Sequence, residues 1–340
     1  MSENITRRTF VGTSLAGGLA VTRATAAPPV AVKVGLYSIT YLGLWYRGEA
    51  LTHEQLIERA KRFGYEGIEI DGKRPHGNPL DMPKSRCQEI RKRAEGEGVP
   101  VYAVAADNDF SSPIPEHREA QLAYMRELIK MTAHLGVRVL RVFAAWHGVT
   151  VVPPPKGGGR YDIAIGVWNA THKPFPAEQT WEWCRQGLIE SARWAGDHGV
   201  TLALQNHGPV INDYRDMLKM VREVNSPHLK VCLDAPLLKK RDDDSIRKAA
   251  LQARSLQVLS HFGYEKKPDG TITKPGTFYK PFVRAMAQIG YTGYIGYELC
   301  HPLPVIDGRT VGIEYVDKNA RLAAEFMHGV IDEARKESAT

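Results

Sequence analysis

Four polar residues that can bind a metal, Gln205, Asp234, His261 and Glu298, each follow a short apolar run. The runs read TLALQNH, LKVCLDAP, LQVLSHF and YIGYELC, and about one strand and one helix separate each from the next. If they are successive parallel strands of one barrel, their C-terminal ends meet at one face, where an amide oxygen, two carboxylates and an imidazole would form a ligand set for a divalent metal. Each residue alone has a structural explanation, such as a helix cap, but four consecutive strand ends favour a metal enzyme.

The elements that must position these residues form a regular series. From residue 31 onward, short apolar runs alternate with longer segments of helical period, and glycine follows several of the expected helices. This alternation predicts a (β/α)8 TIM barrel in a single domain over residues 27–340. No glycine-rich dinucleotide fingerprint follows the first run, which disfavours a nucleotide-binding fold. The expected strands are 32–36, 67–70, 101–105, 137–144, 201–206, 229–233, 256–260 and 294–297, and the expected helices are 52–63, 82–97, 116–135, 180–198, 212–224, 244–253, 278–289 and 316–336.

The N-terminus has the layout of an export leader. Arg7 and Arg8 precede a mild apolar stretch over residues 10–21, and a small-x-small cleavage signal covers residues 24–26. The segment resembles a twin-arginine signal peptide, which implies passage through the twin-arginine export machinery and removal of residues 1–26. The apolar stretch is too short for a stable membrane span. We therefore expect a periplasmic or secreted protein, and unphosphorylated carbohydrates suit that location because phosphorylated sugars are mostly cytosolic.

Charge and cysteine content exclude several other classes of protein. The full chain carries a net charge of +7, of which the leader contributes +2, and the rest is spread along the helices. Without a basic stripe or an aromatic platform, nucleic-acid binding has little support. The four cysteines show no CxxC spacing, which argues against a zinc ribbon or a redox pair. Cys232 and Cys300 are expected to be small core residues, so metals that prefer sulfur ligands are disfavoured.

One connection is unusually long. Residues 147–179 contain runs of proline and glycine and show no clear element of their own. The connection leaves the C-terminal end of the fourth expected strand, so it would overhang the active face of a barrel. We interpret it as a substrate lid, and a mobile surface excursion is the competing interpretation.

The chain from Val32 to about Ala334 resembles the xylose-isomerase-like barrel superfamily of sugar isomerases and epimerases. The segments that carry the likeness are GYEGIEIDG at 64–72, RVLRVFAAW at 138–146, LALQNHG at 202–208, CLDAP at 232–236 and GYELC at 296–300. The resemblance implies a divalent metal, manganese first and cobalt or magnesium as alternatives, held by the residues that end strands five to eight. Those residues are Gln205, Asp234, His261 and Glu298, and Glu298 would also act as the general base.

The chain departs from this family at Gln205. In the two-base epimerases of the family this position is usually a glutamate that works opposite the carboxylate of strand eight, and glutamine cannot exchange a proton near neutral pH. His207, two residues later on the same strand face, is the available substitute acid or base, and it can equally hydrogen-bond a sugar hydroxyl.

Other residues are expected at the same face of the barrel. Arg141 can bind an oxyanion or a sugar hydroxyl, although an internal ion pair with Glu69 is a plainer interpretation. An aromatic ring at Trp146 suits stacking on a sugar. The predicted substrate-binding residues are Glu69, Asp107, Arg141, Trp146 and His147.

Three functions compete at this point. The first is a secreted, metal-dependent isomerase or epimerase that removes a proton next to a carbonyl of an unphosphorylated carbohydrate. The second keeps the site but expels the substituent β to the carbonyl of a 3-keto-glycoside, as a lyase or deglycosidase. The third is a non-catalytic carbohydrate-binding barrel in which Gln205 records lost activity. The sequence leaves the sugar, the stereochemistry and a homo-oligomeric state open.

Overall fold

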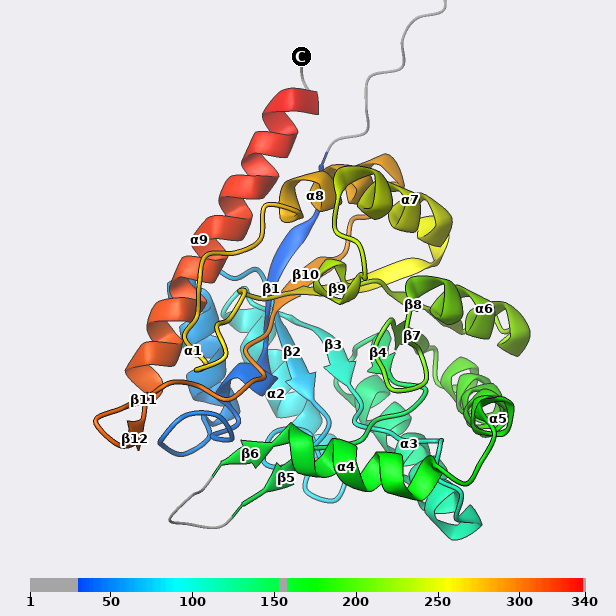
Figure 1. Cartoon of the computed structure of the whole chain (residues 1–340). Helices are drawn as coiled ribbons and strands as arrows, with labels where there is room; N and C mark the ends of the chain where they lie inside the picture. Colours follow the sequence, from blue (N-terminus) through cyan, green and yellow to red (C-terminus); the bar gives the residue numbers. More distant parts are fainter. Residues whose placement is uncertain (1–29, 153–157, 339–340) are drawn as a thin grey trace, which may run out of the picture.

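The computed structural model describes residues 30–152 and 158–338 and confirms the predicted barrel. Eight parallel strands close on themselves in the order β1-β10-β9-β8-β7-β4-β3-β2 (Figure 1). Their closure sets the C-terminal strand ends around one opening, where residues from distant parts of the chain can meet. The strands are β1 (Lys33–Tyr37), β2 (Ile68–Asp71), β3 (Val101–Ala105), β4 (Val139–Val142), β7 (Thr201–Gln205), β8 (Leu229–Cys232), β9 (Gln257–Phe262) and β10 (Tyr294–Tyr297).

Helices surround the barrel and cover its outer surface (Figure 1). Among the described residues, none of them has the length and apolar character needed to cross a membrane. The predicted leader, residues 1–26, lies outside the described part of the chain. The helices between and after the barrel strands are α1 (His53–Phe63), α2 (Lys84–Gly96), α3 (Pro115–His134), α5 (Ala177–Asp197), α6 (Tyr214–Val224), α7 (Asp243–Ala253), α8 (Tyr279–Gln288) and α9 (Ile313–Ser338).

Local signals explain where elements begin and end. Thr52 caps α1: its hydroxyl accepts from the Gln55 backbone amide, and the Gln55 side chain accepts from the Thr52 amide. Gly64 ends the helix with φ of +83°, a left-handed conformation that glycine adopts without strain. The fourth strand is shorter than expected because the Asn108 side chain bonds both backbone groups of Phe143, at 3.0 and 2.7 Å.

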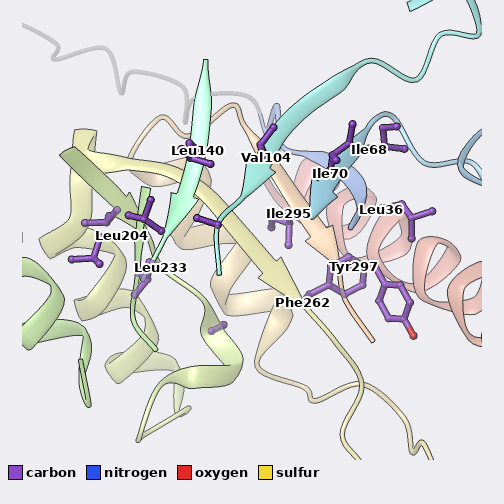
Figure 2. Packing of buried hydrophobic residues seen from close by; sticks show 14 of the residues in the cluster. Leu36, Ile68, Ile70, Val104, Leu140, Leu204, Leu233, Phe262, Ile295 and Tyr297 are labelled. Atoms are coloured by element: carbon purple, nitrogen blue, oxygen red, sulfur yellow. The ribbon is translucent and has the colours of Figure 1, made fainter. Parts of the chain in front are cut away.

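Side chains on the outer face and the inner face of the barrel pack into two separate clusters. The outward side chains join one continuous apolar core with the helices, as Leu36 and Ile70 do with Leu56 of α1. Figure 2 shows part of this core, with labels on Leu36, Ile68, Ile70, Val104, Leu140, Leu204, Leu233, Phe262, Ile295 and Tyr297. The second, smaller cluster consists of Ala103, Ala203, Cys232 and Leu259. Because three of these four residues are small, the barrel interior keeps room for larger polar side chains.

The connection over residues 147–179 differs from the structureless loop that the sequence predicts. It contains a short hairpin, β5 (Thr150–Val151) with β6 (Gly159–Arg160), followed by a helix, α4 (Tyr161–His172). In Figure 1 the hairpin and α4 lie at the end of the barrel toward which the β2 and β3 arrows point. The helix was missed because its sequence, YDIAIGVWNATH, is rich in β-branched residues and contains Gly166, which all have weak helix propensity.

A buried histidine pair predicts loss of stability in acid. The rings of His53 and His76 lie 5.7 Å apart, and His76 Nε2 donates to the Leu51 carbonyl at 2.8 Å. Burial lowers both pKa values to about 4, helped by the neighbouring histidine and Arg86 at His53 and by Lys73 at His76. Both rings therefore stay neutral in the folded protein while they gain protons in the unfolded chain below pH 6.5, so stability falls between about pH 6.5 and pH 4.

We expect the free energy of unfolding to lose roughly 3 kcal/mol through His76 over this range. In a His76→Gln variant, which can still donate to Leu51, urea unfolding at several pH values should show a flatter profile. A variant as acid-sensitive as the wild type would contradict this assignment.

Candidate metal centre and substrate pocket

Three of the four predicted metal ligands meet below the open end of the barrel. Asp234 is their centre: its Oδ1 accepts from the His261 backbone amide at 2.7 Å, and its Oδ2 lies 3.1 Å from His261 Nδ1. The side-chain amide of Gln205 also donates to Asp234 Oδ2 and lies 3.5 Å from His261 Nδ1. The Asn206 side chain fixes this arrangement by accepting from the Asp234 backbone amide at 2.8 Å.

Glu69 holds the other side of the imidazole. Its Oε2 lies 2.9 Å from His261 Nε2, although strands β1 and β10 stand between β2 and β9. Gly296 on β10 borders this contact. A Cβ at Gly296 would lie 3.2 Å from the His261 ring, 3.5 Å from Glu69 Oε2 and only 2.5 Å from the Tyr102 hydroxyl. The absent side chain on β10 thus leaves room for a carboxylate from β2 beside a histidine on β9.

The buried charged groups of this cluster stabilise one another in their ionised forms. Burial lowers the pKa of His261, but the carboxylates of Glu69 and Asp234 raise it more, so its pKa lies well above the usual value. Burial raises the pKa of Asp234, but His261 and the hydrogen bond from Gln205 lower it more, so the net shift is downward. Without a metal, the cluster is a buried imidazolium between two carboxylates.

Cys232 packs in the core, as predicted, and it also belongs to this cluster. Its Sγ lies 3.4 Å from Asp234 Oδ1 and 3.6 Å from His261 Nδ1. Single ligand atoms of Cys232, Asp234 and His261 all lie within 4.8 Å of one another, a grouping that could hold a metal ion. The sequence signal was the two-residue spacing of Cys232 and Asp234, which puts both on one strand face. Burial raises the pKa of the thiol, so it stays protonated until a cation displaces the proton.

Glu298 stands apart from this group of ligand atoms and lines the pocket above it. Burial raises its pKa to about 7; His261 acts in the opposite direction, and Asp234 adds to the increase. Within the part of the chain that the structure describes, no side chain donates a hydrogen bond to the Glu298 carboxylate. A carboxylate with this pKa can both take and return a proton near neutral pH.

The pocket is small, about 50 Å³, and charged groups face Glu298 across it. Arg141 is 3% exposed, and its Nη2 donates to the Tyr37 hydroxyl at 2.7 Å. Its Nε and Nη1 find no partner among the described residues, and the expected ion pair with Glu69 is not formed there. Buried guanidinium donors without partners are costly, so Arg141 is poised for an oxygen atom of a ligand.

Lys73 and Asp71 were not predicted, yet Lys73 lines the pocket and Asp71 is buried next to Lys73. Lys73 Nζ lies 3.3 Å from Asp107 and 3.7 Å from Asp71, which accepts from the Tyr37 hydroxyl at 2.7 Å. Burial and then Asp71 raise the pKa of Asp107 to about 6. Asp71 could have been found, because it follows Glu69 by two residues on the same strand; Lys73 lies in a loop and carries no periodic signal.

His207 reaches the same pocket as a neutral imidazole. Its Nδ1 donates to the Gly208 carbonyl at 2.7 Å, which leaves Nε2 as a hydrogen-bond acceptor. Burial lowers its pKa to about 4. Of the two roles left open for His207, this geometry favours accepting a hydrogen bond from a ligand over proton transfer.

Of the two neighbouring residues Trp146 and His147, only Trp146 lines the pocket. Trp146 lines the pocket and stacks on Phe143, with ring centroids 4.8 Å apart. His147 lines a neighbouring cavity instead, and its Nδ1 lies 2.8 Å from the Gly148 carbonyl. Of the predicted substrate-binding residues, Asp107, Arg141 and Trp146 line the pocket, while Glu69 is fully buried beneath it and His147 lies beside it.

Comparisons with known proteins agree with this architecture. A family model described as xylose isomerase-like TIM barrel matches residues 57–326. Among solved structures, D-psicose 3-epimerase from Clostridium cellulolyticum H10 is 21% identical, with a TM-score of 0.65 over 88% of this chain and 99% of that one. L-ribulose 3-epimerase is 18% identical, with a TM-score of 0.64 over 91% and 97% of the two chains. The 3-keto-D-glucoside 4-epimerase from E. coli is 18% identical, with a TM-score of 0.61 over 87% and 99%. No curated protein sequence matches the chain.

Proposed function

This chain belongs to the xylose isomerase-like TIM barrel family, and we propose that it is a metal-dependent isomerase or epimerase of unphosphorylated carbohydrates. The observation that carries the proposal is the presence, in one pocket, of a carboxylate of raised pKa, Glu298, and of two unpartnered donors of Arg141, Nε and Nη1. Similar folds include epimerases of ketoses and of a keto-glucoside, which supports a substrate with a carbonyl next to a carbon-bound proton.

The residues below the pocket fit a divalent cation. His261 offers Nδ1 toward Asp234 and Gln205, while Nε2 donates to Glu69, and metal-binding histidines usually have such an outer carboxylate partner. Gln205 would bind through its amide oxygen once its side-chain amide, whose NH2 group here donates to Asp234, has turned over. Glu298 would complete the set from the pocket wall. A bound divalent metal, for which we propose Mn²⁺, supplies polarisation of the sugar carbonyl and neighbouring hydroxyl.

The chain's own residues then account for proton transfer. Glu298 takes the carbon-bound proton next to the carbonyl and returns it to the adjacent carbon on the same face; epimerisation needs a different proton donor on the opposite face. Arg141 donates hydrogen bonds from Nε and Nη1 to the oxygen on which negative charge develops. His207 accepts a hydrogen bond from a sugar hydroxyl, and the Lys73–Asp107 pair orients another hydroxyl. Trp146 covers the pocket and excludes water.

A second candidate is elimination from a 3-keto-glycoside, and Gln205 favours it. With glutamine at this position the pocket lacks a facing carboxylate that would reprotonate the opposite side of the sugar. Glu298 would remove the proton at C2, the C1–O bond would break, and the aglycone would leave with that electron pair and gain a proton. One base is enough for this reaction.

Export remains part of the proposal. The paired arginines and the cleavage signal within residues 1–26 support twin-arginine export to the periplasm or beyond. Free sugars and glycosides are the carbohydrates that such a location offers.

The decisive experiment follows hydrogen exchange. Purified protein with Mn²⁺ is incubated in heavy water with D-fructose and, separately, with methyl 3-keto-β-D-glucoside. We expect deuterium next to the carbonyl of the recovered sugar, and no incorporation after the metal is removed with a chelator. Release of methanol from the keto-glucoside would favour elimination. Sugar binding without either product would support a non-catalytic barrel and overturn the proposed function.

A further inference from the structure

A second cavity lies directly beside the catalytic pocket and has no role so far. Its volume is about 550 Å³, compared with about 50 Å³ for the pocket, and both are lined by Trp146 and Val149. These two side chains are therefore the partition between them. A ligand too large for the pocket would extend past this partition into the cavity.

The walls of the cavity are fixed to the barrel. Trp168 of α4 donates from Nε1 to the Ser111 hydroxyl at 3.0 Å, and His172 Nε2 lies 2.9 Å from the Ser111 carbonyl. The two rings stack on each other with centroids 3.9 Å apart. Ser111 belongs to the segment between β3 and α3. The hydrogen bonds of Trp168 and His172 with Ser111 therefore hold α4 against that segment and fix the position of this wall of the cavity.

The side chains that line the cavity suit the binding of an aromatic group. Ile114 and Val167 line opposite sides of the cavity, one ahead of α3 and one on α4, and they are 45% and 60% exposed. Large apolar side chains exposed on both sides of a hollow often mark a binding surface. Trp146 and Trp168 add flat aromatic faces, and His117 supplies a polar group.

We propose that this cavity binds the aromatic aglycone of a glycoside whose sugar ring occupies the catalytic pocket. This inference rests on the proposed function, because it takes the pocket as the sugar site. An aryl group would cover the apolar side chains of Ile114 and Val167, stack near Trp168, and place a polar substituent of the ring near His117. The preferred substrates are then aryl glycosides or their keto forms, and free monosaccharides fill the site only partly.

The test compares two glycosides that differ only in the aglycone. Calorimetry with the full Mn²⁺-loaded protein measures binding of 4-nitrophenyl β-D-glucoside and methyl β-D-glucoside. We expect the nitrophenyl compound to bind about tenfold more tightly or better. Val167→Lys should remove this preference, because it places a charge at the cavity wall. Ile163→Lys is the matched control on the same helix, outside the cavity lining, and should retain the preference.

The outcomes separate this inference from the proposed function. Equal affinity for the two glycosides, or an unchanged preference in Val167→Lys, would overturn the aglycone site even if hydrogen exchange is observed. An aryl preference that Val167→Lys abolishes would support the site even if no exchange occurs, and only the proposed function would then fail. Ile114→Lys tests the opposite wall independently if Val167→Lys does not fold.

Discussion

Replacing Glu298 by Gln is expected to slow hydrogen exchange of the sugar about a thousandfold, because general bases contribute roughly 10²–10⁴ to such rates. The amide keeps the size of the side chain and an oxygen ligand but cannot accept the proton. Binding of Mn²⁺ should weaken far less, since Asp234 and His261 meet independently of Glu298. The measurement is deuterium incorporation at saturating metal, with metal affinity determined by calorimetry.

The control for Glu298→Gln is Glu265→Gln. Glu265 follows β9 and pairs with Arg241 at the surface, so its amide variant should exchange hydrogen at the wild-type rate. Undiminished exchange in Glu298→Gln would exclude Glu298 as the base and would direct attention to the Lys73–Asp107 pair.

Replacing Glu69 by Gln is expected to weaken Mn²⁺ binding about 10- to 100-fold, the usual effect of losing an outer partner of a metal-binding histidine. Glu69 touches neither the pocket nor the cation site directly; it accepts a hydrogen bond from His261 Nε2 and so fixes the orientation of the ring. With Gln at this position, the metal-free imidazolium loses one carboxylate, so the pKa of His261 should also fall.

Two measurements distinguish this positioning role from a general loss of stability. Calorimetry gives the Mn²⁺ affinity, and NMR titration gives the pKa of His261, which a simple folding defect would not shift specifically. Glu97→Gln serves as control, because Glu97 pairs with Lys61 on the surface and should change neither quantity. An unaltered metal affinity in Glu69→Gln would show that the ring is held by other contacts.

The barrel and the meeting of Gln205, Asp234 and His261 could be predicted from the sequence because both depend on short-range rules. Strand alternation decides that Gln205, Asp234 and Glu298 point inward at the end of their runs, and closure of parallel strands brings such ends together. The same alternation also applied to Cys232. The core position predicted for Cys232 is confirmed, because it packs against Ala103 and Ala203. Its place beside Asp234 and His261 was not predicted, because a small sulfur-containing residue in an apolar run suits a core equally well.

The rest of the site depends on contacts that no local pattern encodes. The bond between His261 and Glu69 joins residues 192 positions apart and is bordered by Gly296 on an intervening strand. Arg141 has a partner in Tyr37 rather than in Glu69, a choice decided by the depth of each side chain in the barrel. Helix α4 has weak propensity and is held by tertiary bonds to Ser111, so propensity could not reveal it.

The contact of Glu69 with His261 also makes the site a reporter of how the chain folds. β2 lies near the start of the barrel sequence and β9 near its end, and the seam where β1 meets β10 runs between them. The two side chains can approach only after that seam has formed. Any cation that requires a correctly oriented His261 therefore binds the completed ring of strands in preference to a partly assembled one. Refolding followed through metal uptake would accordingly time the joining of the two ends of the sheet.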